Sequence, residues 1–176
     1  MTRIKARIFW PITLACVLAD CTTKRLAAER LPDGVPAYDV VRDFVRFSLA
    51  YNPGAVFGLP ASRWMLSLLA IVVLVVLAHF YRATAPNDRM RATALALLCG
   101  GAIGNLIDRL LSARGVVDFI DIGIGTHRFW TFNLADVGVT LGAAILALTL
   151  IRDEVREPAS ASTESQTASS PPLSPG

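Results

Sequence analysis

Four apolar stretches, each about 20 residues long, constrain this chain more than any other feature of its sequence. A helix of about 20 apolar residues is long enough to cross the hydrocarbon core of a bilayer. The stretches cover residues 8–28, 62–82, 91–111 and 133–152. Apolar residues make up 53% of the chain and its mean hydropathy is +0.50. We therefore predict an all-α membrane protein with four transmembrane helices.

The distribution of basic residues predicts how the chain is oriented. The segment before the first stretch and the short linker after the second are densely basic, with Arg3, Lys5 and Arg7 in one and Arg82, Arg89 and Arg91 in the other. By the positive-inside rule both segments lie in the cytoplasm, so both termini are cytoplasmic. The net charge of +3 fits basic rims at the membrane surface and gives no reason to invoke nucleic acid.

The chain divides into a membrane-embedded domain, residues 1–156, and a tail, residues 157–176. The tail is rich in Ala, Ser, Thr, Gln and Pro, a composition that buries too little apolar surface to fold. We expect a disordered cytoplasmic tail, and its role stays open.

Short strands are predicted between the membrane stretches. Val45, Phe47, Leu49 and Tyr51 alternate with more polar residues, the period-two pattern of a half-buried strand. Residues 116–122 and 128–132 are also rich in β-branched or aromatic side chains. These three segments predict a small extracytoplasmic sheet that rests on the membrane surface.

Small residues recur at helical spacing in the third and fourth stretches. They are Ala92, Ala96, Gly100, Gly104, Gly138 and Gly142. Small residues four apart let membrane helices approach closely, so we expect the third and fourth helices to pack together. For the glycines we expect packing and no further role. Their packing would gather the polar residues at the outer ends of the two helices.

Several of these polar residues have structural explanations. Asp20 and Lys24 are one helical turn apart, and they form either a solvated surface pair or part of a site. Asn133, followed three residues later by Asp136, has the spacing of a helix cap with an acid near the positive end of the dipole. Capping alone would account for both.

Asp118 has no such explanation, because it lies in the apolar segment 116–120 without a basic neighbour in sequence. An ionisable residue in a membrane-type segment is a functional candidate by default. A second buried carboxylate, Asp136, would raise the pKa of one of the two, as in the proton-sharing pair of an aspartic protease. The sequence has no His-Glu-x-x-His zinc motif and no Gly-x-Ser-x-Gly elbow. An acid pair is the remaining protease chemistry.

Five short blocks of the sequence resemble signal peptidase II, the lipoprotein signal peptidase of bacterial membranes. The blocks are Asp-x-x-Thr-Lys at 20–24, Asn-x-Gly-Ala-x-Phe at 52–57, Gly-Gly-Ala-x-Gly-Asn-x-x-Asp-Arg at 100–109, Val-Val-Asp-Phe-Ile at 116–120 and Phe-Asn-x-Ala-Asp at 132–136. The resemblance runs from about residue 8 to 152. It implies a fold of four transmembrane helices, a small extracytoplasmic β-cradle and a short surface helix.

The resemblance also implies an activity and a set of site residues. Enzymes of this family are aspartic endopeptidases without metal or cofactor, and they cleave prolipoproteins on the amino side of a diacylglyceryl-modified cysteine. It implies catalytic roles for Asp118 and Asp136. The positions that match substrate-binding residues are Asn52, Gly54, Asn105, Arg109 and Asn133, and those that match structural support are Asp20, Lys24 and Asp108.

The same resemblance predicts location and partners. We expect a multi-pass protein of the bacterial inner membrane whose site faces the periplasmic side and whose contacts are prolipoproteins, membrane lipids and cyclic-peptide inhibitors. We expect a monomer. Two other functions remain open at this point, a small proton-coupled transporter whose acids bind a cation and a non-catalytic assembly factor whose acids only cap and pair.

Overall fold

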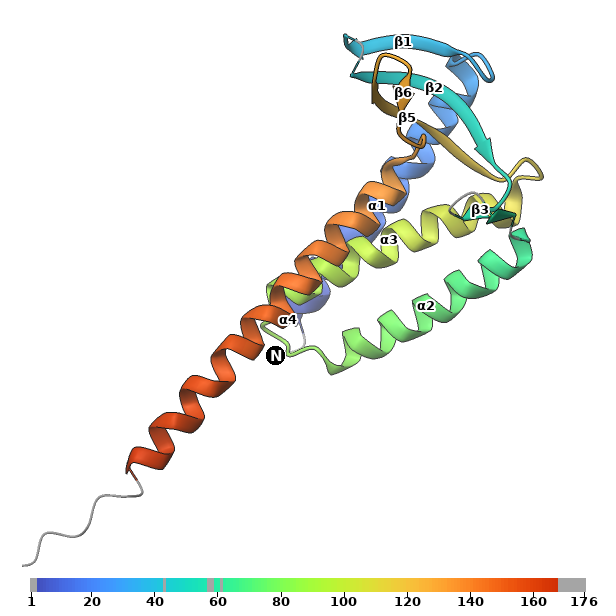
Figure 1. Ribbon diagram of the computed structural model, residues 1–176. Helices are drawn as coiled ribbons and strands as arrows, with labels where there is room; N and C mark the ends of the chain where they lie inside the picture. The colour runs from blue at the N-terminus through green and yellow to red at the C-terminus, as the bar shows by residue number, and fades with distance from the viewer. Residues whose placement is uncertain (1–2, 43, 57–58, 61, 168–176) are drawn as a thin grey trace, which may run out of the picture.

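The structure, a computed structural model, describes residues 3–42, 44–56, 59–60 and 62–167. These residues form four helices, α1 (Arg3–Arg30), α2 (Arg63–Ala83), α3 (Arg89–Leu111) and α4 (Leu134–Thr167). Helix α3 packs against the other three (Figure 1). A small β-sheet covers one end of the bundle, and α1 begins at the opposite end (Figure 1). The bundle therefore has one end that the sheet covers and one end without a sheet.

Three of the helices have the length and composition of membrane spans. They are α2, α3 and residues 134–154 of α4, with mean hydropathies of 2.4, 1.5 and 2.1. Helix α1 covers the predicted stretch 8–28, but Asp20, Lys24 and Arg25 interrupt its apolar sequence, and it does not qualify by the same measure. The four helices are confirmed, and the crossing of the membrane by α1 stays a prediction.

Small residues of α3 form two stripes that face different helices. A Cβ added to Gly100 would lie 2.6 Å from the Cβ of Cys16 in α1. A Cβ added to Gly101 would collide with the carbonyl oxygen of Ala135 in α4. The expected packing of α3 on α4 is confirmed, but the stripe through Gly100 also brings α3 against α1. One helix can serve two close neighbours because residues i and i+1 point in different directions.

The main sheet has four antiparallel strands in the order β1-β2-β5-β6. Their bounds are β1 Pro36–Val41, β2 Val45–Asn52, β5 Val116–Ile124 and β6 His127–Arg128. Strands β3 (Ala55–Val56) and β4 (Leu59–Pro60) form a separate pair. The sequence predicted β2 and β5 and missed β1, whose pattern is less regular. The predicted strand at 128–132 is shorter, since β6 ends at Arg128 and Phe132 forms only an isolated bridge with Ile120.

The register of β2 on β5 carries one irregularity close to Asp118. Phe47 pairs with Ile120 and Ala50 with Asp118, so β2 contains one more residue than β5 between these pairs. An extra residue of this kind bends the strand and increases its twist. Gly115, with a φ of 97°, precedes β5 and passes so close to the Asn52 carbonyl that a Cβ would collide with it. These features bring the end of β2 beside the start of β5.

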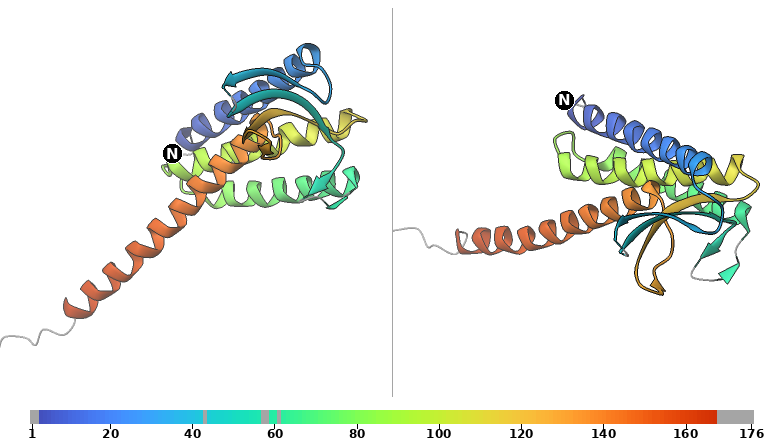
Figure 2. Two further views of the ribbon diagram at one scale, coloured as in Figure 1. Left: turned by 45° about the horizontal axis from the view of Figure 1, so that its top comes forward. Right: turned by 90° about the horizontal axis from the view of Figure 1, so that it is seen from above.

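The C-terminal part of the chain and the implied surface helix differ in part from expectation. Helix α4 continues past the predicted boundary at 157 to Thr167 and runs well beyond the other helices (Figure 2). Residues 168–176 of the predicted disordered tail lie outside the described residues. The short surface helix implied by the family resemblance has no counterpart among the described residues, in which only α1 to α4 are α-helical.

Candidate active site

The first turn of α4 is held by a reciprocal pair of hydrogen bonds between Asn133 and Asp136. The Asp136 backbone N–H donates to Asn133 Oδ1 at 3.1 Å, and the Asn133 backbone N–H donates to Asp136 Oδ2 at 3.3 Å. This is the capping-box arrangement, which satisfies N–H groups that have no partner inside the helix. The capping interpretation of these two residues is confirmed, and it directs the Asp136 carboxylate toward the interior of the site.

Asp20 of α1 holds the same helix start from another side. Its Oδ1 accepts a hydrogen bond of 2.8 Å from the Ala135 backbone N–H. Asp20 is fully buried, and a Cβ at Gly104 would collide with its carboxylate. Glycine is therefore required at this point of α3, because the Asp20 side chain passes directly over it to reach α4.

Asp118 lies in the buried part of β5, with 5% of its surface exposed. Asn133 Nδ2 donates to Asp118 Oδ1 at 2.6 Å. Burial, followed by the negative charge of Asp136, raises the pKa of Asp118 from 3.8 to about 7, against smaller opposing effects of hydrogen bonds from Asn133 and Asn52 and of the Lys24 charge. The surroundings of Asp118 therefore favour its protonated form more than water does.

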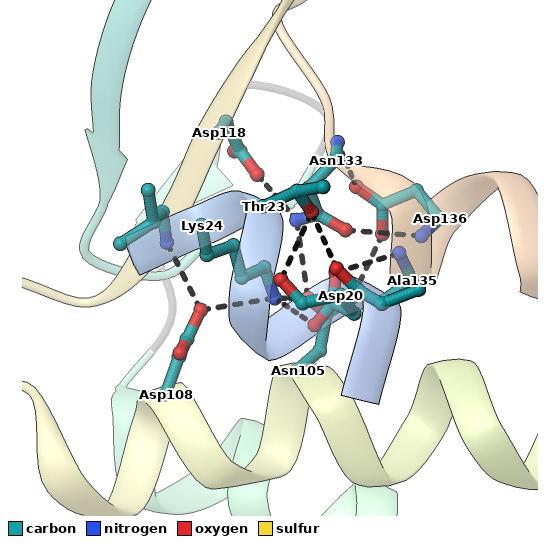
Figure 3. A network of polar contacts seen from close by, with 11 residues as sticks. Asp20, Thr23, Lys24, Asn105, Asp108, Asp118, Asn133, Ala135 and Asp136 are labelled. Atoms are coloured by element: carbon teal, nitrogen blue, oxygen red, sulfur yellow. Dashed lines mark hydrogen bonds and ion pairs between the residues drawn. The ribbon is translucent and has the colours of Figure 1, made fainter. Parts of the chain in front are cut away.

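Two asparagines connect Asp118 to Asp136 (Figure 3). Asn133 donates to Asp118, as above, and to Asn105 Oδ1 at 3.1 Å. Asn105 in turn donates from Nδ2 to Asp136 Oδ1 at 2.8 Å. A side-chain amide has both donor and acceptor atoms, so the two asparagines can form a continuous chain of hydrogen bonds between the carboxyl groups. The two acids come from β5 and α4, and the chain of amides sets their relative position.

Lys24 is the cation beneath this network. Its Nζ lies 2.8 Å from Asp20 Oδ2 and 2.9 Å from Asp108 Oδ2, and it donates to Asn105 Oδ1 at 2.9 Å. Only 3% of the Lys24 side chain is exposed. The alternative of a solvated Asp20–Lys24 pair is therefore wrong, because packing of α1 against α3 removes both groups from water. Asp108 also accepts from the Val117 backbone N–H at 3.1 Å and so ties β5 to α3.

Arg109 and Asn52 approach the two carboxyl groups from other elements. Arg109 of α3 is half-buried and within electrostatic range of both Asp118 and Asp136. Its guanidinium donates no hydrogen bond to any other described residue, so its donors remain available. Asn52, at the end of β2, hydrogen-bonds to the Asp118 carboxyl group. Its Oδ1 also accepts from the Gly54 backbone N–H at 3.0 Å.

The predicted site residues thus gather at one end of the bundle, at the junction of the helix ends with the sheet. Asn52 is the last residue of β2 and Gly54 follows this strand, Asp118 comes from β5, and the other residues come from α1, α3 and the start of α4. Asp20, Lys24 and Asp108 form the ion-pair layer beneath the two candidate catalytic acids. Their proposed roles in catalysis, binding and support stay predictions at this point.

Sequence reasoning missed an apolar hollow beside Asp136. This cavity of about 310 Å³ is lined by Phe129, Phe132, Asp136, Val137, Thr140 and Leu141. Its walls come from the segment after β6 and from the first turns of α4. The spacing of Asp136 and Thr140, one helical turn apart, was the available signal for a shared face. A carboxylate beside an apolar hollow is a suitable place for a reactive group that acts on an apolar ligand.

The arrangement supports acid–base chemistry by side chains. One carboxyl group is buried with a raised pKa, and the other sits at a helix N-terminus with two hydrogen-bond donors. Such pairs divide the roles of acid and base because their surroundings differ. Among the described residues, no group of three or more His, Cys, Asp or Glu side chains is placed to hold a metal ion.

The chain matches a known family over most of its length. A family model described as Signal peptidase (SPase) II matches residues 12–152. The chain is 37% identical over 150 residues to the lipoprotein signal peptidase of Halalkalibacterium halodurans, which covers 84% of this chain and 94% of that protein. It is 41% identical over 124 residues to the lipoprotein signal peptidase of Pseudomonas putida, covering 67% of this chain and 72% of that protein.

A solved structure agrees with the sequence comparisons. It is described as a bacterial membrane enzyme determined by the in meso method at 2.3 Å resolution. It superposes with a TM-score of 0.73 at 33% identity, over 81% of this chain and 87% of that chain. Because sequence, family model and structure agree over the region that contains the two acids and their network, the chain belongs to the signal peptidase II family.

Proposed function

We propose that this protein is an aspartic endopeptidase that removes signal peptides from bacterial prolipoproteins, cleaving on the amino side of the diacylglyceryl-modified cysteine. The observation that carries the proposal is the pair Asp118 and Asp136, which an asparagine chain links and which differ in their surroundings. The relatives reported above are named lipoprotein signal peptidase. They give no support to the transporter alternative, which we set aside.

The surroundings of the two acids suggest how they divide the reaction. Asp118, whose pKa is raised to about 7, carries the shared proton and donates a hydrogen bond to the scissile carbonyl. Asp136 accepts two hydrogen bonds and lies near the positive end of α4, so it takes the proton from the attacking water. Water attacks the carbonyl carbon, and the proton held by Asp136 then passes to the leaving amine.

The neighbouring polar residues orient the acids and the substrate. Arg109, whose guanidinium donates no hydrogen bond to another described residue, and Asn52 and Gly54, at and just after the end of β2, are proposed to bind the peptide backbone. The side-chain amide groups of Asn105 and Asn133 donate hydrogen bonds to the carboxyl groups of Asp136 and Asp118, so their first role is to hold these two acids in place. Any hydrogen bonds from these two asparagines to the substrate use the donor and acceptor positions that the acids do not occupy.

The distribution of basic residues supports a proposed topology, with which the position of this site agrees. All four helices cross the bacterial inner membrane, both termini are cytoplasmic, and the site faces the periplasmic side, where the lipid anchor of the substrate holds the scissile bond near the membrane surface. Residues 1–156 form the peptidase domain, which acts as a monomer and binds cyclic-peptide inhibitors of the family. Reporter fusions after residue 35 and after residue 156 test this topology, and a cytoplasmic signal from both positions would contradict it.

Replacement of either acid tests the proposed function. Asp118→Asn and Asp136→Asn are expected to abolish cleavage of a diacylglyceryl prolipoprotein in vitro while the protein still inserts into membranes. Asp39→Asn is the matched control, because Asp39 lies in the same sheet but is exposed and pairs with Arg46 at the surface. Normal cleavage by either dyad variant would exclude the proposed mechanism.

A further inference from the structure

A second cavity lies in the helix bundle, away from the candidate active site. It measures about 350 Å³ and lies between α1, α2 and α3. Phe9 and Trp10 contribute from α1, Ala78, Tyr81 and Arg82 from α2, and Cys99 from α3. The α1 and α2 residues lie in the N-terminal third of α1 and the C-terminal third of α2, so the cavity is in the half of the bundle that is farther from the sheet (Figure 1).

The end of this cavity is built and held by specific contacts. The buried Lys5 amine donates hydrogen bonds of 2.7 Å to the Tyr81 carbonyl and 2.6 Å to the Thr84 carbonyl, which close the last turn of α2. The rings of Phe9 and Tyr81 lie 4.3 Å apart between their centroids. These contacts connect α1 and α2 at this end, and the cavity lies between the two helices next to them.

The lining is complementary to a lipid chain that has an anionic group at one end. The walls are almost entirely apolar, and Arg82 is the charged residue in the lining. Arg82 is exposed, and its guanidinium forms no ion pair within the described segments. Leu74 and Arg82 both line the cavity, and their separation corresponds to about 12 Å of helix. This length is close to half of a hydrocarbon core of about 30 Å, which is one leaflet.

We propose that this cavity holds one acyl chain of an anionic glycerophospholipid, whose phosphate contacts Arg82. Basic pockets between membrane helices bind acidic lipid headgroups on the cytoplasmic side. Trp10 and Tyr81 are aromatic residues of the kind found at the depth of the headgroups. The bound chain fills the gap between α1 and α2 and so stabilises the bundle. The proposal is independent of the peptidase chemistry and rests only on the membrane location.

Fluorescence quenching of Trp10 tests this site directly. The full-length variant Trp64→Phe/Trp130→Phe retains Trp10 as the single tryptophan. It is reconstituted in phosphatidylcholine vesicles that contain either dibrominated phosphatidylglycerol or dibrominated phosphatidylcholine as the quencher. We expect phosphatidylglycerol to occupy the site with a preference of about fivefold, the value for one Arg contact with an anionic lipid.

Two variants in this background decide between the occupants. Arg82→Gln is expected to remove the preference for phosphatidylglycerol over phosphatidylcholine. Ala78→Phe is expected to exclude the acyl chain because the larger side chain fills the gap. Arg89→Gln is the matched control, an exposed cation at the same end of the bundle that does not line the cavity, and it keeps the preference. No preference in the parent variant, or an unchanged preference in Arg82→Gln, overturns the proposal. If Ala78→Phe loses cleavage while the parent has no lipid preference, the occupant is the substrate signal helix, which also overturns it.

Discussion

At the scale of single residues, Asp118 shows how surroundings decide the chemistry of a side chain. A carboxyl group in water is ionised at neutral pH, but burial in β5 and the nearby Asp136 disfavour its charge and raise its pKa to about 7. Asp136 and Asn133 combine two functions, since the hydrogen bonds that cap α4 also orient the candidate catalytic carboxylate. The structural and functional interpretations of these residues are therefore compatible.

The raised pKa predicts how protein stability depends on pH. Between pH 3.8 and about 7 the folded state binds more protons at Asp118 than the unfolded state, so the free energy of unfolding decreases as the pH rises through this range. Asp118→Asn removes this loss and is expected to stabilise the protein at pH 8 by an amount on the order of a few kcal/mol, with little effect at pH 4. Thermal unfolding in detergent at both pH values measures it. A stability difference that is the same at both values would contradict the assigned pKa.

The same pKa predicts the alkaline limb of the pH–rate profile. If Asp118 donates the proton, kcat decreases about tenfold per unit above a pH of about 7. The Asn52 hydrogen bond lowers the pKa of Asp118, so Asn52→Ala is expected to move this limb to higher pH. Cleavage rates from pH 5 to 10 test both statements, with Asp39→Asn as the control. A limb that stays in place in Asn52→Ala would show that another group controls it.

At the scale of elements, the site depends on three helix and strand ends that meet. The start of α4 carries Asp136, the buried half of β5 carries Asp118, and the last turns of α3 carry Asn105 and Asp108. Asp108 fixes β5 to α3 through the Val117 backbone N–H. The distance between the acids is therefore controlled by how closely the helices approach.

Gly104 tests this dependence on close approach. A Cβ at this position collides with the Asp20 carboxylate and lies 3.4 Å from the Ala135 Cβ, so Gly104→Ala must displace the buried carboxylate that holds the start of α4. We expect a loss of about 1–3 kcal/mol of stability from overpacking, together with reduced kcat. Thermal unfolding and the cleavage assay measure the two effects. Ala143→Val, on the exposed face of α4, is the control, and equal effects of the two substitutions would argue against a specific contact.

At the scale of the whole molecule, one buried cation joins elements that are far apart in the sequence. Lys24 of α1 contacts Asp20 on its own helix and Asp108 and Asn105 on α3, while Asp20 reaches the start of α4. The helices α1, α3 and α4 thus share one polar layer below the candidate active site. A buried layer of this kind couples the stability of the bundle to the geometry of the site.

Lys24 and its neighbour Arg25 give a matched comparison. Lys24→Met leaves Asp20 and Asp108 buried without a cation and is expected to destabilise the protein by about 3–5 kcal/mol and to abolish cleavage. Arg25→Met breaks an exposed pair with Glu29 and is expected to change neither property measurably. Thermal unfolding and cleavage of both variants test this. A stable and active Lys24→Met protein would show that the polar layer is dispensable.

Much of the candidate site could be predicted from local sequence. The alternation at 45–51 predicted β2 and the spacing of Asn133 and Asp136 predicted the cap. The five blocks predicted the site residues, which the structure brings together at one end of the bundle and whose roles stay predictions. The sequence did not predict β1, the continuation of α4 beyond 157, or the apolar hollow beside Asp136. Strand β1 and the hollow depend on pairing and packing between segments, about which a local pattern contains no information, whereas the end of α4 runs beyond the other helices (Figure 2) and has no such explanation.

The sequence by itself determined the helices, the two central strands and the family, because helical periodicity, strand alternation and motif spacing are properties of neighbouring residues. Only the tertiary structure decided that the Asp20–Lys24 pair is buried, that Asn105 and Asn133 link the two acids, and that the surroundings of Asp118 raise its pKa. The physical reason is that burial and charge interactions depend on distances in space. The packing of α1, α3 and α4 and the pairing of β2 with β5 create the low-dielectric surroundings in which a carboxyl group holds its proton.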